Sequence, residues 1–512
     1  MSVESQLPQG WEVVRLVDLA AIEMGQSPPS STYNSMGTGL PFFQGKAEFR
    51  DRYAEARVWC SEPNKIAEQE DILLSVRAPV GPTNLAPSRC CIGRGLSAIR
   101  PEAGINRNYL LHAFRRFANE LDAKGTGTTF KAVSGQTVRN FLLPIAPSAE
   151  QSRIADALDE LLSDLDAGVA VLERARGKLK QYRASVLKAA VEGALTADWR
   201  KAHPDAEPAT ELLKRILAER RRRWEEDQLK KFKDAGKAPP KDWKEKYREP
   251  AAPDTTNLPP LPSGWCWASC EQVGDTTTGF TPPTNRPELF GGPVPFFKPT
   301  DLDAGYHVVH HRESLTLEGS KAGRLVPALS ILVTCIGATI GKTGLARVEC
   351  ATNQQINSLT IPHVWVLPQF AFWFMNSPIG QMQIVGNASA TTLPILNKSR
   401  FEALPIALPP ISEQRVAIET VEKQISVIDH LEAELDAKLT GATALRQSIL
   451  RHAFTGKLVP QDPNDEPASE LLKRISAERE QRQRAAKAEK RAGRKPGAKP
   501  AGKRVRAEAV ED

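Results

Sequence analysis

The sequence repeats itself, and this repetition constrains the fold more than any other feature. Residues 207–220 (EPATELLKRILAER) and 466–479 (EPASELLKRISAER) are identical at twelve of fourteen positions. The Leu-Pro-x-Gly-Trp segment at residues 7–11 returns at residues 261–265, an offset of 254. Because 512 residues exceed what one hydrophobic core usually serves, we expect two copies of one structural unit.

The first part of each copy predicts a globular α/β domain. Short apolar runs bounded by Gly and Pro, such as residues 72–81 and 330–341, are typical of strands joined by tight turns. We expect a helix at residues 109–121 in the first copy and at residues 370–382 in the second. The second helix is aromatic, and we assign Phe372, Trp373 and Phe374 to packing.

The second part of each copy predicts a long helix. Ser148 and Gln151 have the spacing of a capping box, and Glu413 suits the positive end of a helix. Apolar residues then recur at every seventh position: Leu158, Leu165, Leu172, Leu179 and Val186, and again Val421, Ile428, Leu435, Ala442 and Ile449. The first helix, from residue 149 to about 193, would be about 65 Å long. Neither helix can bury its stripe on its own domain, so we expect the two to pack together as a coiled coil.

These observations predict a fold and a set of boundaries. The fold class is mixed α/β, with two globular domains separated by long helices and an internal tandem duplication. The expected segments are a globular domain at 1–148, helices at 149–235 (the second at 209–232), a Pro-rich linker at 236–260, a second globular domain at 261–410, helices at 411–480 and a basic, disordered tail at 481–512.

Composition and charge exclude several classes of protein. The net charge of +7 lies largely in the tail, where residues 482–506 hold eleven Lys/Arg and one Glu, so the rest of the chain is close to neutral. The N-terminus lacks the basic-then-apolar order of a signal peptide, and no apolar run is long enough to cross a membrane. Seven scattered cysteines form no zinc or redox motif. We therefore expect a cytoplasmic protein with reduced thiols.

The sequence contains no complete motif for catalysis or for nucleotide or metal binding. The segment 337–343 (GATIGKT) resembles a phosphate-binding loop but has three residues, not four, between its first Gly and the Gly-Lys pair. The matching segment of the first copy, residues 78–83, has no Lys. No Asn/Asp-Pro-Pro-aromatic motif for methyl transfer occurs, and the histidines show no metal or triad spacing. We predict no catalytic residues and no metal ligands.

Both copies instead carry loops of small polar and basic residues. Gln, Asn, Arg and Lys can pair with base edges, and Thr can bind phosphates, so these loops are candidates for contact with DNA. The candidates are Gln26, Gln44, Lys46, Arg77, Arg94, Thr128, Thr129 and Lys131 in the first copy, and Lys298, Thr300, Lys342, Gln354, Gln355, Asn357, Thr391 and Thr392 in the second.

The ordered double set of motifs resembles the specificity subunit of type I restriction-modification systems. It comprises a Gly-Trp opening, a Pro-Phe-Phe segment, a Thr-Thr patch, a Leu-Pro-Ile turn and Glu-Gln at the start of a long helix. The residues that carry it best are Leu142 to Ile145 with Glu150 and Gln151, and Leu404 to Ile406 with Glu413 and Gln414. The likeness covers the chain up to about residue 480, and the basic tail is outside it.

The resemblance implies two target-recognition domains and an antiparallel coiled coil that fixes the spacing between them. Each domain would read one half of a bipartite, asymmetric site in double-stranded DNA. Two modification subunits that bind S-adenosylmethionine would methylate adenine, and restriction subunits with ATP and Mg²⁺ would cleave, while this chain would bind no cofactor. Two alternatives stay open: a stand-alone methyltransferase or ATPase, and a coiled-coil scaffold without DNA binding.

Overall fold

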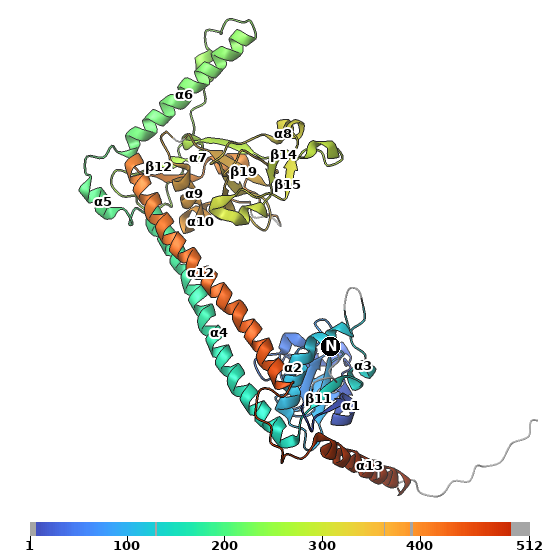
Figure 1. Ribbon diagram of the computed structural model, residues 1–512. Helices are drawn as coiled ribbons and strands as arrows, with labels where there is room; N and C mark the ends of the chain where they lie inside the picture. Colours follow the sequence, from blue (N-terminus) through green and yellow to red (C-terminus); the bar gives the residue numbers. More distant parts are fainter. Residues whose placement is uncertain (1–6, 128–130, 363, 390–392, 493–512) are drawn as a thin grey trace, which may run out of the picture. The chain divides into compact units, whose positions relative to one another are not determined.

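The computed structural model describes residues 7–127, 131–362, 364–389 and 393–492 (Figure 1). The chain divides into two compact units. Unit 1 contains the chain up to Leu172 and from Ala437 onward, and unit 2 contains Glu173–Asp436. Each unit therefore holds one globular domain and segments of both long helices. Within the described ranges, no helix is both long and apolar enough to span a bilayer.

The globular domain of unit 1 is built on three antiparallel or mixed sheets. A two-stranded sheet pairs β1 (Glu12–Arg15) with β11 (Leu142–Ile145). A four-stranded sheet has the order β2 (Ala20–Met24), β10 (Leu96–Pro101), β7 (Ile72–Ser75), β8 (Thr83–Leu85). A five-stranded sheet has the order β3 (Tyr33–Asn34), β5 (Val58–Cys60), β4 (Leu40–Phe43), β9 (Cys90–Ile92), β6 (Ile66–Ala67). The helical elements are α1 (Leu16–Leu19), η2 (Ser30–Thr32), η3 (Lys46–Glu48), α2 (Arg107–Ala123) and α3 (Gly135–Arg139).

The globular domain of unit 2 repeats this plan. A two-stranded sheet pairs β12 (Cys266–Ser269) with β20 (Pro405–Leu408). A four-stranded sheet has the order β13 (Asp275–Thr278), β19 (Ile356–Thr360), β16 (Ile331–Thr334), β17 (Thr343–Leu345), and a three-stranded sheet has the order β15 (Glu313–Leu315), β14 (Phe290–Phe297), β18 (Ala351–Thr352). The helical elements are α7 (Cys270–Val273), η5 (Pro287–Leu289), η6 (Asp301–His307), α8 (Leu317–Gly323), α9 (Pro368–Asn376), α10 (Pro378–Gly386) and α11 (Lys398–Glu402).

Strand register confirms the internal duplication. In unit 1 the parallel pair β4–β9 sets Phe43 opposite Ile92, and in unit 2 the parallel pair β14–β18 sets Phe297 opposite Thr352. Both phenylalanines are fully buried. The Pro-Phe-Phe segment is therefore repeated because its last residue anchors the same core position in each domain.

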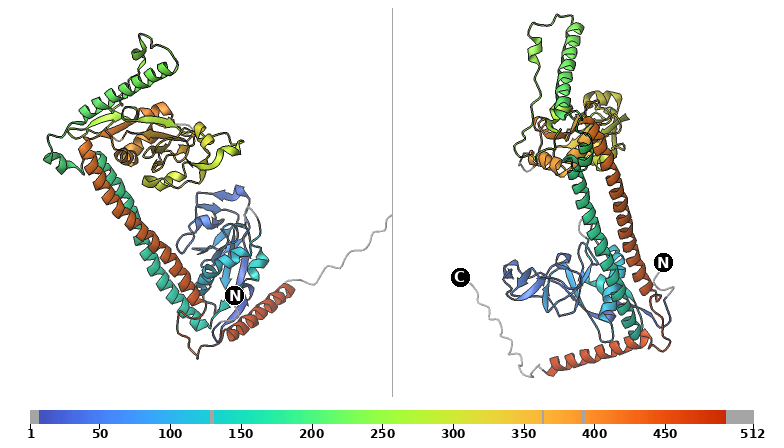
Figure 2. Two further views of the ribbon diagram at one scale, coloured as in Figure 1. Left: turned by 45° about the horizontal axis from the view of Figure 1, so that its top comes forward. Right: turned by 90° about the vertical axis from the view of Figure 1, so that its left-hand side faces the viewer.

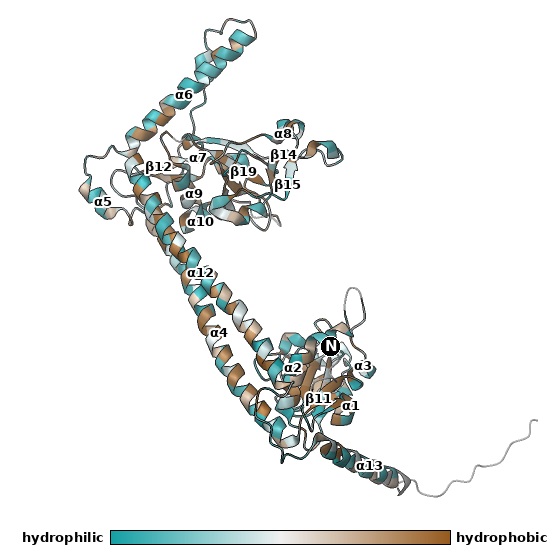
Figure 3. Ribbon diagram, in the orientation of Figure 1, coloured by the Kyte–Doolittle hydropathy of each residue, from teal (hydrophilic) through white to brown (hydrophobic). Residues whose placement is uncertain are grey.

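Two long helices pair in antiparallel fashion within each unit. They are α4 (Ser148–Val191) and α12 (Ile411–Ala453). In unit 1 Asp166 pairs with Arg446, and in unit 2 Arg183 binds both Asp429 and Glu432. Hydrophobic residues recur along both helices between hydrophilic ones, as Figure 3 shows. This confirms the pairing that the heptads predict.

Burial along the heptad stripe is uneven. Leu158, Val186, Val421 and Ile428 are buried where a globular domain covers the helix pair. The residues nearest the middle of each helix, such as Leu172 and Leu435, are only half-buried. A pair of helices without a third layer cannot enclose both flanks of its seam, so these side chains stay partly open to solvent.

Each copy's second helical part packs on the globular domain of the other copy. These parts are α5 (Ala197–Ala202) and α6 (Ala209–Asp234) in unit 2 and α13 (Ala468–Ala492) in unit 1. η4 (Trp243–Lys246) follows α6 and packs on it through Trp243. The amide of Ala209 donates to Gly264 O at 2.8 Å, and the amide of Ala468 donates to Gly10 O at 2.9 Å. The repeated Gly-Trp turn thus binds the first residue of the repeated helix that begins with Glu-Pro-Ala (α6 and α13), which we call the EPA helix.

Three expectations from the sequence are wrong in detail. The helix expected at 370–382 is two helices, α9 and α10, because Pro378 lacks an N–H and Ser377 caps the second helix. The capping box at Ser148 does not form, since its hydroxyl donates to Gly104 O and the Gln151 side chain bonds Ala146 O. The tail was expected to be disordered from residue 481, but α13 continues to Ala492.

Candidate DNA interface

Loops from four places in the first domain meet along one edge, which we call the first loop edge (residues 25–27, 44–46, 77 and 93–95). The amide of Gln26 donates to Ile92 O at 3.0 Å, and the amide of Gly93 donates to Phe43 O at 2.8 Å. The amide of Arg94 donates to Ser27 Oγ at 3.3 Å. These bonds hold the ends of β2 and β4 against the turn between β9 and β10.

Two glycines allow this close approach. A Cβ on Gly25 would lie 2.1 Å from Gly93 O, and a Cβ on Gly95 would lie 2.1 Å from Gln44 O. Side chains other than hydrogen cannot fit at either position. The turn is pressed against its neighbours, so the adjoining side chains are directed outward.

The predicted site residues of the first copy lie together on this edge. Gln26, Gln44, Lys46, Arg77 and Arg94 are all exposed. Among the residues that the structure describes, no ion-pair partner is present for Lys46, Arg77 or Arg94. The edge therefore presents free hydrogen-bond donors and positive charge to solvent, as contact with DNA requires.

Lys131 joins the same surface through the backbone. Its carbonyl accepts from the Ala78 amide at 2.9 Å, next to Arg77. Its ammonium pairs with Asp122 at 2.8 Å and is half-exposed. Thr128 and Thr129, which precede it, lie outside the described residues.

The second domain presents a matching edge, which we call the second loop edge (residues 279–281, 298–300 and 353–355). The amide of Gly279 donates to Ile356 O at 3.0 Å, and the amide of Asn353 donates to Phe297 O at 3.2 Å. The hydroxyl of Thr281 donates to the Gln354 side chain. Lys298, Thr300, Gln354 and Gln355 of the predicted site are on this edge.

The two edges share a backbone and differ in side chains. The amide that bonds the last Phe of Pro-Phe-Phe is Gly93 in one domain and Asn353 in the other, so Arg94 stands where Gln354 stands. In the same alignment Gln44 stands at the position of Lys298, and Lys46 at that of Thr300.

Two residues of the second loop edge were missed by the sequence analysis. Phe280 occupies the position of Gln26, and its side chain is 42% exposed. Arg324 donates to Thr278 O at 3.1 Å and lies beside the same loop. No motif in the sequence singles out Phe280 of the Gly-Phe-Thr-Pro segment. Arg324 is brought beside the loop by a left-handed turn after α8 (φ 53°).

Three predicted residues of the second copy fit less well. Asn357 is only 3% exposed, and its side chain binds Thr278 and Leu396 O, so we withdraw it from the site. Lys342 pairs with Asp303 of η6 at 2.6 Å, and Lys298 pairs with Glu313. Both lysines would have to leave these partners to reach DNA. Thr391 and Thr392 lie outside the described residues.

The segment resembling a phosphate-binding loop is a turn between strands. β16 ends at Thr334, the Gly341 amide donates to Thr334 O at 2.9 Å, and β17 begins at Thr343. A phosphate loop leads into a helix, whose N-terminus binds the anion, and here a strand follows. This agrees with the strand-turn-strand expected from the sequence.

The cysteines are structural. All seven are free thiols. Burial raises the pKa of Cys335 and Cys350 to about 12, and that of Cys266 to about 11, so these thiols are protonated and unreactive. Within the described part of the chain, no cluster of three or more His, Cys, Asp or Glu side chains could hold a metal ion.

A buried hydrogen bond explains why Gly-Trp and Glu-Gln recur together. The indole of Trp11 donates to Glu150 Oε2 at 2.9 Å, and the indole of Trp265 donates to Glu413 Oε2, also at 2.9 Å. Each bond joins the first turn of a globular domain to the first turn of a long helix. The partnering glutamine, Gln151 or Gln414, accepts from a backbone amide of the same domain.

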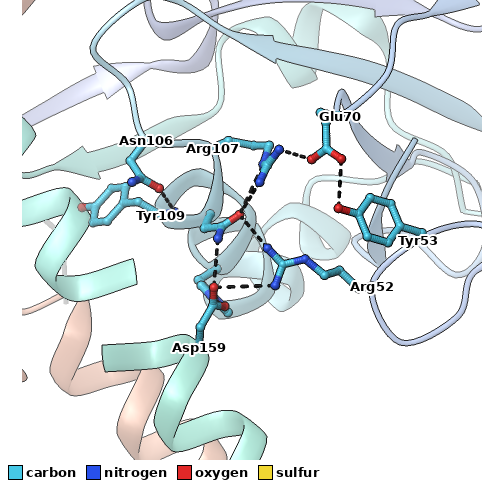
Figure 4. Close-up of polar contacts among 9 residues, drawn as sticks. Arg52, Tyr53, Glu70, Asn106, Arg107, Tyr109 and Asp159 are labelled. Carbon is cyan, nitrogen blue, oxygen red and sulfur yellow. Dashed lines mark hydrogen bonds and ion pairs between the residues drawn. The ribbon is translucent and has the colours of Figure 1, made fainter. Parts of the chain in front are cut away.

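A polar cluster also fixes the first domain on α4 (Figure 4). Asp159 accepts from Asn108 Nδ2 at 2.9 Å and lies 3.7 Å from Arg52 Nη1. Arg107 bridges onward from Asn108 to Glu70. The domain is therefore held at a second point along the helix, nine residues beyond the Glu150 of the Trp–Glu bond.

The second copy has a carboxylate at the matching helix position. Glu422, at the 263-residue offset from Asp159, accepts from the Tyr306 hydroxyl. Tyr306 also stacks on Trp373 with ring centroids 4.8 Å apart. Both copies thus set a rigid globular domain on a helix pair and leave its loop edge free.

The fold and the two edges define the class of protein: a duplicated recognition protein with two loop edges built on one backbone plan. The profile of the type I restriction modification DNA specificity domain matches residues 8–170 and 262–440. The chain belongs to this family. Its members recognise the DNA sequence and direct partner subunits, and the catalytic activities lie in those partners.

Individual relatives agree with this assignment. The chain is 38% identical over 180 residues to the type I restriction enzyme MjaX specificity subunit of Methanocaldococcus jannaschii, a match that covers 34% of this chain and 42% of that protein. It is 24% identical over 498 residues to the EcoBI specificity subunit of Escherichia coli, covering 95% and 94%. A solved chain from a study of complex assembly and conformational transition in the type I R-M system has the same fold, with a TM-score of 0.57, 17% identity and coverage of 88% and 100%.

Proposed function

We propose that this chain reads a bipartite, asymmetric site in double-stranded DNA, with one half-site read by each loop edge. The observation that carries the proposal is the pair of edges built on one backbone plan with different side chains, Arg94 against Gln354 and Lys46 against Thr300. Arg pairs best with guanine, and Gln with adenine, so edges of unlike side chains select unlike half-sites.

The partners follow from the family. Two modification subunits that bind S-adenosylmethionine methylate adenine in the site, and restriction subunits that use ATP and Mg²⁺ cleave the DNA. This chain supplies neither a cofactor nor a metal ligand and works in the cytoplasm with its DNA. It sets which sequence the complex acts on.

The paired helices supply a docking surface for the modification subunits. Large apolar side chains stand exposed on them, among them Tyr182 at 52% and Val427 at 57%. In unit 2 these two residues line one shallow hollow between α4 and α12. Apolar side chains at that exposure favour burial against a partner.

The test is to map methylated sites in cells that carry the complex with edge variants. We expect Q44A/K46A/R94A to relax or lose one half-site and K298A/T300A/Q354A to affect only the other. Each lost base contact should cost about 1–3 kcal/mol of discrimination. An unchanged methylated sequence in both variants would refute the proposal, and a purified chain that alone transferred methyl groups would replace it with an enzyme.

A further inference from the structure

The far part of α6 and the segment returning from it form a hairpin, residues 221–248, which we call the basic arm (Figure 2). The buried residues of α6 are Ala209, Leu212 and Ile216, all in its first half. Arg220 donates to Gly274 O at 3.1 Å, and beyond it no residue of α6 is buried. Most of the arm is hydrophilic in Figure 3.

The arm is folded by its own small aromatic cluster. Trp224 stacks on Trp243 with ring centroids 5.9 Å apart and meets Tyr247 at 5.3 Å. Phe232 packs edge-on against Trp243 at 6.2 Å. Gly236, with a φ of 64°, lets the chain turn back after the helix. The arm is thus a built element rather than a loose linker.

The charge of the arm is concentrated at its tip. Residues 221–248 hold eleven Lys/Arg and six Asp/Glu. At the base the charges are balanced, for example by Arg222 with Glu219 and Lys244 with Glu225. At the tip five exposed lysines have no ion-pair partner within the described ranges: Lys230, Lys231, Lys233, Lys237 and Lys241.

The other copy also extends into a basic segment. α13 packs on the globular domain of unit 1 through Leu471 and Ile475, and Arg479 pairs with Glu102 at 2.8 Å. Past that residue the sequence turns basic, with eleven Lys/Arg and one Glu in residues 482–506. Each globular domain therefore receives a basic extension from the helical part of the other copy.

The two extensions share charge but not sequence. Identity is twelve of fourteen residues up to Arg220 and Arg479 and falls to two of the next fourteen. A surface that packs on the same partner surface in both copies is expected to keep its residues. Residues 207–220 and 466–479, which pack on the two Gly-Trp turns, do so. Binding to phosphates depends on the number of positive charges and tolerates any order of residues, which favours DNA as the ligand.

We propose that the basic arm binds the phosphate backbone of duplex DNA outside the half-site read by the second loop edge. The proposal rests on the proposed function, because the second loop edge must bring DNA to this unit. The arm would add affinity that depends on salt and not on sequence. It would not alter which site is recognised.

The test uses the full chain in its complex with modification subunits and the triple variant K230Q/K231Q/K233Q. Binding is measured against salt concentration on DNA with long flanks and on DNA trimmed to the recognised site. On long DNA we expect the slope of log K against log salt to fall by about 0.9 for each lysine that contacts a phosphate. On trimmed DNA the slope should not change. The methylated sequence should also stay the same.

A matched control removes three other exposed lysines from helices, in the variant K201Q/K214Q/K473Q. Its slope should equal that of the unmodified complex. An unchanged slope in the arm variant, or a loss of modification subunits from it, would overturn the proposal, and the second result would make the arm a protein-docking element. A complex that methylates DNA with no sequence preference would instead refute the proposed function, whatever the arm does.

Discussion

The two Trp–Glu bonds look alike but have different surroundings. The second oxygen of Glu413 accepts from Thr196 at 2.6 Å and from Arg200 Nη2 at 2.9 Å. The second oxygen of Glu150 is buried and has no hydrogen-bond partner within the described residues. Burial is the main cause that raises the pKa of Glu150. Glu413 therefore has a cation and a hydroxyl as partners for its second oxygen, whereas the second oxygen of Glu150 is buried without one.

This difference predicts unequal responses to the same Glu→Gln substitution at the two positions. E413Q leaves Arg200 without its ionised partner and should lower the free energy of unfolding by about 1–3 kcal/mol. E150Q keeps an oxygen for Trp11 and removes a poorly solvated charge, so its effect at neutral pH should be within about 0.5 kcal/mol or stabilising. Urea unfolding of the two variants measures this. Equal losses would mean that the surroundings of the two carboxylates do not matter.

The pH dependence follows from the raised pKa of Glu150. The folded chain holds the proton on Glu150 more tightly than the unfolded chain does. The stabilisation of the folded state by this protonated carboxyl is therefore fully present below the unfolded pKa and is lost as pH rises through the folded pKa. E150Q should remove this loss and flatten the stability profile over the mildly acidic range. Unfolding midpoints at a series of pH values check it, with E413Q as the comparison that keeps Glu150.

At the scale of elements, patterns that depend on neighbours in sequence were predictable. The heptads predict the two long helices, and the repeated motifs predict the duplicated strands. Pro378 was the signal in the sequence that the segment 370–382 divides into two helices, α9 and α10. Single residues of the loop edges could be predicted from the sequence, but their grouping into one edge could not. The hydrogen bonds that join Gln26 to Ile92 and Gly93 to Phe43 connect segments that are distant in the sequence. For the same reason the burial of Asn357 was not foreseen.

The turn between β9 and β10 offers a sharp test of the first loop edge. In G95A the new methyl would meet Gln44 O at 2.1 Å, so the edge must shift although the core is untouched. We expect the half-site read by the first domain to be lost, with the other half-site kept. Sequencing of methylated DNA gives the result.

Gly45 provides the control on the same edge. A Cβ there meets nothing within 4 Å, and its φ of −178° suits any residue. G45A should therefore leave the methylated sequence unchanged. If G45A and G95A behaved alike, the close contact between the loops would not be what shapes the edge.

At the scale of the whole molecule, the first domain depends on α13, which is encoded at the other end of the sequence, and the second domain depends on α6, which is encoded just before it. Ala468, Leu471 and Ile475 of α13 are buried in the same core as Trp11 and the first domain's sheets. A buried Leu or Ile contributes about 1.5–3 kcal/mol. The circular dependence explains why the EPA helix is the best-kept segment of the repeat: it must fit the Gly-Trp turn twice.

This dependence predicts that a deletion at the C-terminus damages the domain at the N-terminus. Removing residues 467–512 uncovers the first domain, so recognition of its half-site should fail although residues 7–145 are intact. The second domain keeps α6 and should still bind its half-site. Removing only residues 493–512 is the control, because it leaves the contacts of Leu471, Ile475 and Arg479 in place. Limited proteolysis and binding to separate half-site duplexes measure both variants, and a first domain that stayed protected without α13 would show that the two copies fold independently.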